Sequence, residues 1–96
     1  MKLTKESPIS PVFAFEGVRN ILITGGVGTL TIERSICNGD FYPLSTNISG
    51  GVAVFQLDGG CAYNGTLEEL CNETEYRFVA DLTSGEVEVL MTRSLF

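Results

Sequence analysis

Acidic side chains are the residues of this chain most able to do chemistry, and many of them lie close together in sequence. The close pairs are Glu68 with Glu69, Glu73 with Glu75, and Glu86 with Glu88. General acid–base catalysis needs two carboxyl groups in different, water-restricted environments. These pairs fall in expected loops or on the polar face of an expected strand, where we interpret them as solvated charges. The sequence also has no histidine, the usual base for a serine nucleophile. We therefore predict that the protein is not an enzyme.

Cysteines and glycines offer two further kinds of site, and neither has the spacing that its chemistry needs. Three cysteines without a histidine or a Cys-X-X-Cys pair do not match a usual zinc site. Because the N-terminus lacks the apolar segment of a signal peptide, we predict that Cys37, Cys61 and Cys71 are reduced thiols. A Cys61–Cys71 bridge is the alternative, since both flank one loop. The glycine-rich turn at 25–28 lacks the Lys-Ser/Thr of a phosphate-binding loop. No metal or cofactor is predicted.

The elements that would position these residues are short strands. Alternating apolar and polar residues predict strands at 12–16, 18–24, 29–35 and 52–57, with a short edge strand at 61–63. Turn signals recur about every 8–12 residues, which is typical of a β-sandwich or a small barrel. The sequence therefore predicts an all-β fold, a small antiparallel β-sandwich of jelly-roll or immunoglobulin-like type with about seven short strands.

The segment Thr66–Leu70 is ambiguous. Its Thr-Leu-Glu-Glu sequence has the form of a capping box, which would begin a single helical turn. An irregular crossing between two sheets is the other interpretation, and we favour it slightly.

The most regular stretch is Glu75–Arg93, in which two alternating runs flank Thr83-Ser84-Gly85. This pattern predicts an antiparallel hairpin with one buried face. The expected register pairs three couples across the turn: Ala80 with Val87, Phe78 with Val89, and Tyr76 with Met91. All six side chains would then lie on the buried face.

The charge balance and the lengths of the apolar runs each exclude one class of function. Twelve acidic and six basic residues give a net charge of −6, and the arginines are scattered, so nucleic-acid binding is not expected. No run approaches the roughly 18 apolar residues of a membrane span. An acidic surface fits either solubility or docking onto a basic protein surface.

Several short motifs between Val27 and Arg93 carry a resemblance to a known family. The motifs are a glycine-rich turn leading into Thr29–Ser35, a Gly39-Asp40 turn before Phe41, the Tyr76-Arg77 pair, and Thr83–Val89. Together they make residues Val27–Arg93 similar to small β-sandwich proteins found among the virion components of tailed bacteriophages. These relatives tend to carry Asp-Gly-Gly and a tryptophan where this chain has Cys-Asn-Gly-Asp and Phe-Tyr.

The resemblance implies a structural virion protein that is assembled in the host cytoplasm. Its most concrete form is a capsid decoration (cement) protein that bridges and stabilises neighbouring capsid subunits. The partners would then be the major capsid protein or another virion protein, together with further copies of the chain in a trimer or dimer. The alternative is a tail, fibre or head–tail attachment module that recognises a carbohydrate or a protein.

The N-terminal residues 1–10 are expected to form an extended arm that precedes a β-sandwich domain at 11–96. After the initiator the arm has only two strongly apolar residues, which is too few to offset the cost of ordering its backbone against its own domain. We therefore predict that both chain ends contact other chains, with the arm lysines reaching carboxylates on a partner. The predicted interface residues are Lys2, Leu3, Lys5, Ile9, Leu95 and Phe96.

Overall fold

The structure is a computed structural model, and it describes residues 1–36, 39–44, 54–70 and 74–93. Its strands are β1 (Lys2–Leu3), β2 (Phe13–Ala14), β3 (Gly17–Ser35), β4 (Tyr42–Pro43), β5 (Val54–Asp58), β6 (Cys61–Glu69) and β7 (Glu75–Arg93). They form one seven-stranded sheet in which every pairing is antiparallel. The prediction of an all-β fold with about seven strands is confirmed. The described part of the chain has no helix long and apolar enough to span a membrane.

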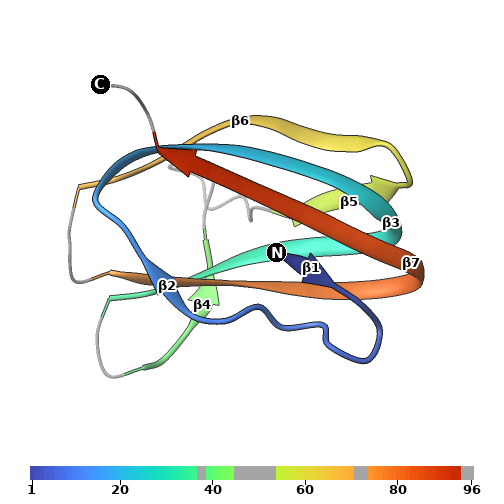
Figure 1. Cartoon of the computed structure of the whole chain (residues 1–96). Helices are drawn as coiled ribbons and strands as arrows, with labels where there is room; N and C mark the ends of the chain where they lie inside the picture. The colour runs from blue at the N-terminus through green and yellow to red at the C-terminus, as the bar shows by residue number, and fades with distance from the viewer. Residues whose placement is uncertain (37–38, 45–53, 71–73, 94–96) are drawn as a thin grey trace.

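The two longest strands, β3 and β7, are the frame of the fold. Each has 19 residues, and they pair from Arg19 with Arg93 to Ser35 with Glu75. Both strands turn back on themselves at the same end of the molecule, on the right in Figure 1. We call this end the corner. The sheet is thereby folded into two layers, which accounts for the small β-sandwich that the strand spacing predicts.

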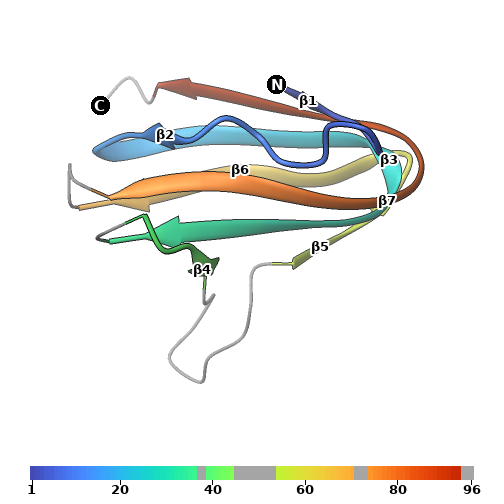
Figure 2. The same ribbon diagram turned by 90° about the horizontal axis from the view of Figure 1, so that it is seen from below.

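The layers are named here by the halves of the two long strands. Layer one contains residues 28–35 of β3 and 75–82 of β7, together with β2, β4 and β5. Layer two contains residues 17–25 of β3 and 87–93 of β7, together with β1 and β6. Strands β5 and β6 follow the same course, since the turn at 59–60 carries the chain from layer one to layer two (Figures 1 and 2).

The position of the corner in β3 is determined by glycines. Gly25, Gly26 and Gly28 all have positive φ, and a Cβ built on Gly28 would overlap the carbonyl oxygen of Asp81. The register of β3 against β7 shifts between Gly25 and Gly28, which is a β-bulge. A side chain at these positions would strain the backbone or collide with the facing strand. The glycine-rich stretch is therefore a bend inside one continuous strand, and the prediction of two strands separated by a turn is corrected.

The bulge also changes which residues point into the core. In β3 the buried positions are odd before the corner (Ile21, Ile23) and even after it (Leu30, Ile32). In β7 they switch in the opposite order, from even to odd. Because side chains alternate with a period of two, a shift of one residue moves the buried set to the other face. Both strands shift together at the corner, so both halves of each strand face one core.

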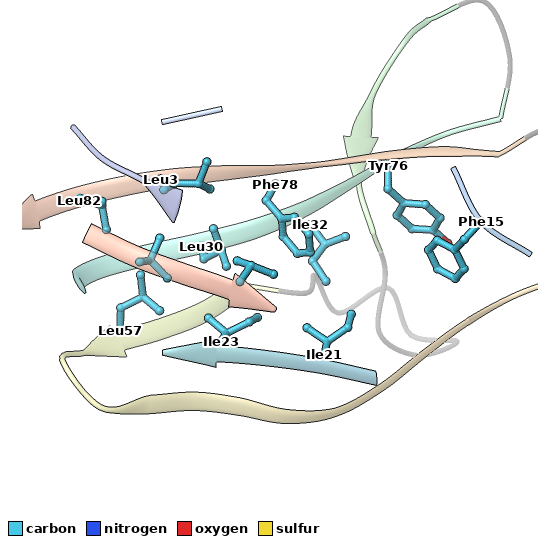
Figure 3. Close-up of a cluster of buried hydrophobic side chains, with 13 residues drawn as sticks. Leu3, Phe15, Ile21, Ile23, Leu30, Ile32, Leu57, Tyr76, Phe78 and Leu82 are labelled. Carbon is cyan, nitrogen blue, oxygen red and sulfur yellow. The ribbon is translucent and has the colours of Figure 1, made fainter. Parts of the chain in front are cut away.

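The core lies between the two layers and runs from the corner to the opposite end (Figure 3). Its fully buried members include Ile23, Leu30, Phe78, Val87 and Val89, all with essentially no exposed surface. The opposite end, which we call the open end, is filled by stacked aromatic rings. These rings belong to Phe13, Phe15, Tyr76 and Phe78.

The predicted hairpin is half correct. Its buried face is confirmed for five of the six residues, whereas the side chain of Met91 is only half-buried. The five are Tyr76, Phe78, Ala80, Val87 and Val89. The predicted register is wrong, because the two runs do not pair with each other. Ala80 pairs with Leu30, and Val87 pairs with Gly25. The two runs lie in opposite layers and each extends the sheet beside β3.

Three other strand boundaries also differ from the predictions. The first strand shrinks from 12–16 to two residues, and the strand at 52–57 is described as Val54–Asp58. The short edge strand at 61–63 is the beginning of the nine-residue strand β6. Since β6 includes most of Thr66–Leu70, neither the helical turn nor the irregular crossing occurs there.

The expectation that residues 1–10 stand apart from the domain is wrong. Leu3 is a core residue with 2% exposure, and β1 pairs with β7 in layer two. In layer one, Ser10 N–H donates to the Phe78 carbonyl, and Phe78 N–H donates to Ser10 Oγ. One large anchor and a series of backbone hydrogen bonds therefore secure the segment along the outer edge of β7 (Figure 2). The number of apolar residues in the segment does not reveal these backbone bonds.

Candidate functional site

The buried carboxylate of Glu69 is the first candidate site. Glu69 is the last residue of β6, and its partner across the sheet is Gly17, which has no side chain to compete for the space inside. Arg34 Nε donates to Glu69 Oε1 at 2.8 Å, and Arg34 Nη2 donates to Oε2 at 3.1 Å. Tyr76 Oη donates to Oε1 at 2.7 Å. Because Glu69 belongs to layer two and the other residues to layer one, this cluster joins the layers at the open end.

The protonation states of the cluster follow from this geometry. Hydrogen bonding to the Glu69 carboxylate raises the pKa of the Arg34 guanidinium well above its ordinary value, despite an opposing contribution from burial. Burial, followed by the hydrogen bond to Glu69, raises the pKa of the Tyr76 phenol to about 12. At neutral pH the guanidinium is therefore charged and the phenol is protonated.

The role of this cluster is structural and not catalytic in its geometry. Both oxygens of the Glu69 carboxylate accept hydrogen bonds from a fixed cation, and the residue is only 4% exposed. A general acid or base must reach a substrate proton, and this carboxylate is enclosed instead. The Phe15 ring stacks on Tyr76 beside the cluster, and the guanidinium of Arg19 lies 5.2 Å from the Phe15 ring centre. The cluster is best described as a clasp between the layers.

The sequence interpretation of the carboxylates as solvated is correct for three of the described residues, wrong for Glu69, and only partly right for Glu88, which is half-buried. Glu68, Glu75 and Glu86 are exposed, whereas Glu69 is buried. The alternation of side chains along a strand is the signal that identifies it. If 61–69 is a strand, Glu69 lies on the same inward face as Leu67. Glu73 lies outside the described residues. Within the described ranges no three metal-ligating side chains come together.

Of the three cysteines, only Cys61 lies among the residues that the structure describes. Cys61 is an exposed free cysteine, so the alternative Cys61–Cys71 bridge does not form. Cys37 and Cys71 lie outside the described residues, and their reduced state stays a prediction.

The second candidate site is a surface, the outer face of layer one. Cross-strand pairing aligns Ile9 with Val79, Val79 with Thr31, and Thr31 with Val54. These four residues, which we call the apolar stripe, lie side by side across four neighbouring segments. Ile9 is 52% exposed and Val54 is 41% exposed, while Val79 and Thr31 are half-buried. On the outer face of a sheet such a row is available to another protein surface.

Polar rows flank the apolar stripe on both sides. Toward the open end, Arg77 Nε donates to Glu33 Oε1 at 2.6 Å, and the Arg77 guanidinium lies 4.4 Å from the ring centre of Phe41. Toward the corner, Asp81 is paired with Thr29. The stripe therefore has an apolar centre and a rim in which one strand carries an arginine and its neighbour a glutamate.

The structure separates the predicted interface residues. Ile9 is in the apolar stripe, and Lys5 is exposed in the turn that follows β1. Lys2 lies 3.9 Å from the carboxylate of Glu86 in its own chain, so a partner carboxylate is not needed to explain its position. Leu3 is inside the core and is removed from the interface set. Leu95 and Phe96 lie outside the described residues.

Comparisons of the chain with protein-family models, with curated proteins and with solved structures gave no match. The function is therefore inferred from the fold, the clasp and the surfaces of this chain.

Proposed function

We propose that this chain is a structural virion protein, most concretely a capsid decoration protein that bridges and stabilises neighbouring capsid subunits. Its partners would be the major capsid protein or another virion protein, and further copies of itself. The proposal takes the protein not to be an enzyme.

The observation that carries this proposal is the contrast between the buried charges and the apolar stripe. The clasp uses its carboxylate to join two layers of the same chain. The apolar stripe, by comparison, lies on the outer face of layer one. In this layer the N-terminal segment pairs with β7 at one edge, and β5 pairs with β3 at the other. A rigid block with an apolar outer row suits a role in which repeated modest contacts add up over a symmetric shell.

The alternative, a tail, fibre or head–tail module that binds a carbohydrate, needs aromatic side chains gathered on a surface. Tyr42 is 68% exposed and is available for such contacts. Tyr63, by contrast, packs on Phe55 and donates its hydroxyl to the Thr66 carbonyl. One exposed tyrosine supports carbohydrate recognition less well than the stripe supports assembly.

Binding to expanded phage capsids that lack a decoration protein tests the proposal. The full chain should co-sediment with capsids and reach saturation at a fixed number of copies per capsid. Val54→Glu should reduce this binding strongly, because it places a charge in the apolar stripe. Leu90→Glu is the matched control, because Leu90 is a similarly exposed apolar residue on the outer face of layer two.

Absence of saturable binding by the full chain would contradict the capsid role. A saturable response to a defined glycan on an array, together with no capsid binding, would favour the alternative.

A further inference from the structure

We propose that the apolar stripe is covered by a second copy of this chain in a face-to-face dimer of layer one. The twofold axis would lie in the interface, parallel to the strands and between β3 and β7. The inference rests on the proposed function in one respect, namely that the apolar stripe is an assembly surface. It names the occupant of that surface and the register of the contact.

The first argument is the order of the four segments that carry the stripe. Across layer one the order is the N-terminal segment, β7, β3 and β5. A twofold axis between β7 and β3 reverses this order in the second copy. Ile9 then faces Val54 of the other copy, and Val79 faces Thr31. Each outer side chain of the stripe meets an apolar group, as an isologous interface requires.

The second argument is the charge pattern beside the stripe. Arg77 and Glu33 are cross-strand partners at the same height, so the same axis sets Arg77 of one copy over Glu33 of the other. Arg77 uses its Nε–H toward Glu33 of its own chain, and a guanidinium has further N–H donors for a second carboxylate. On the other side of the stripe Asp81 would face Thr29, so none of these rows places like charges opposite each other.

The third argument is geometric. Two sheets that pack face to face keep their mean strand directions within about 30° of each other, with interdigitating side chains, and short apolar side chains allow this close approach. Valine, isoleucine and threonine at the centre of the stripe meet that condition. The whole chain carries a net charge of −6, so two copies repel each other over long distances. An association driven by the stripe should therefore strengthen when salt screens this repulsion.

A charge-swap experiment on the full chain tests the dimer. Sedimentation equilibrium of the wild type should show a monomer–dimer equilibrium that shifts toward dimer when salt is raised. Ile9→Lys and Val54→Glu should each weaken the dimer by roughly tenfold or more, since each buries an unpaired charge. The double variant I9K/V54E should recover most of the affinity, because the proposed axis sets the new lysine opposite the new glutamate.

Two controls make the outcome decisive. Leu90→Lys, on the outer face of layer two, should leave the dimer unchanged, and circular dichroism should show the same fold for every variant. A wild type that stays monomeric at all concentrations and salt levels overturns the dimer. So does a dimer that survives Ile9→Lys, or a double variant no tighter than its parents.

The dimer and the capsid role can fail separately. A monomer that still binds capsids saturably, with binding weakened by Val54→Glu, would show that a capsid surface covers the stripe instead. A dimer of the predicted register that does not bind capsids would leave the inference standing and remove the proposed function.

Discussion

The two ends of the sandwich are held together by different kinds of interaction. At the corner the layers are joined covalently, because β3 and β7 run without interruption from one layer into the other. At the open end they are joined by side chains, chiefly the Glu69 carboxylate with Arg34 and Tyr76. The corner depends on backbone conformations that few residues can adopt. The open end depends on charge and protonation.

This difference indicates where each end is vulnerable. A corner built from glycines depends on backbone conformation, so a single added side chain can disrupt it. A clasp built from a partly buried ion pair depends on charge, so it fails when one partner loses its charge. We therefore expect mutations to act most strongly at the corner and changes of pH to act most strongly at the open end.

The largest effect is expected for Gly28→Ala. The new methyl group would overlap the Asp81 carbonyl, at a backbone φ of +140° that residues other than glycine rarely adopt. The variant should lose at least about 3 kcal/mol of folding free energy, measured by urea denaturation. Gly60→Ala is the control at the neighbouring turn, where a Cβ meets only a side-chain oxygen at 3.5 Å. Similar losses in both variants would mean that Gly28 does not define the corner.

The next effect concerns the support of β7 near the corner by the N-terminal segment. Leu3 is 2% exposed and pairs with Val87, so Leu3→Ala should cost about 2–5 kcal/mol by leaving a cavity. Lys5→Ala, in the exposed turn, should be nearly neutral. Thermal denaturation of both variants provides the measurement. If Leu3→Ala melts like the wild type, the segment is not part of the core in solution.

A smaller effect is expected at the clasp. Glu69→Gln keeps the shape of the side chain and removes the charge, so Arg34 loses its buried counterion. We expect a loss of about 1–3 kcal/mol in urea denaturation, reduced by the partial exposure of Arg34. The matched control is Glu68→Gln, one residue away and exposed. A clasp that contributes nothing to stability would give equal curves for both.

The smallest effect at neutral pH is expected for Tyr76→Phe, at about 0.5–1.5 kcal/mol for one lost hydrogen bond. Its signature is the pH dependence. The folded pKa of about 12 lies above the ordinary value of 10.0, so the folded state retains the proton that the unfolded state releases. This contribution is fully present below pH 10 and is lost as the pH rises toward about 12.

Denaturation midpoints measured across this alkaline range should fall more steeply for the wild type than for Tyr76→Phe. Parallel curves would show that folding does not raise the pKa of the Tyr76 phenol.

The buried faces could be predicted from local sequence, and the pairing could not. The alternation in 75–93 identified the inward residues correctly because side-chain phase is a property of the strand itself. The same alternation is compatible with a hairpin or with two halves of a folded strand. A turn containing Gly85 suits both, and the hairpin is the more local solution, which is why it was predicted.

The clasp was missed for a related reason. Glu69 stands in a stretch rich in polar residues, for which the sequence suggested an irregular crossing or a single helical turn. Its burial depends on Arg34 and Tyr76, which approach it only after the sheet has folded over. A charged residue becomes a core residue when a partner of opposite charge is brought to it, and sequence spacing does not encode that partner.

The sequence by itself determined that this protein is all-β, which residues of the last strand face inward, and that its glycines mark changes of direction. These properties depend on period, side-chain size and permitted φ, all of which are local. Only the tertiary structure decided that Ala80 pairs with Leu30, that Leu3 enters the core and that Glu69 joins the layers. Each of these contacts joins segments far apart in the chain, and its free energy exists only when those segments have come together in the folded sheet.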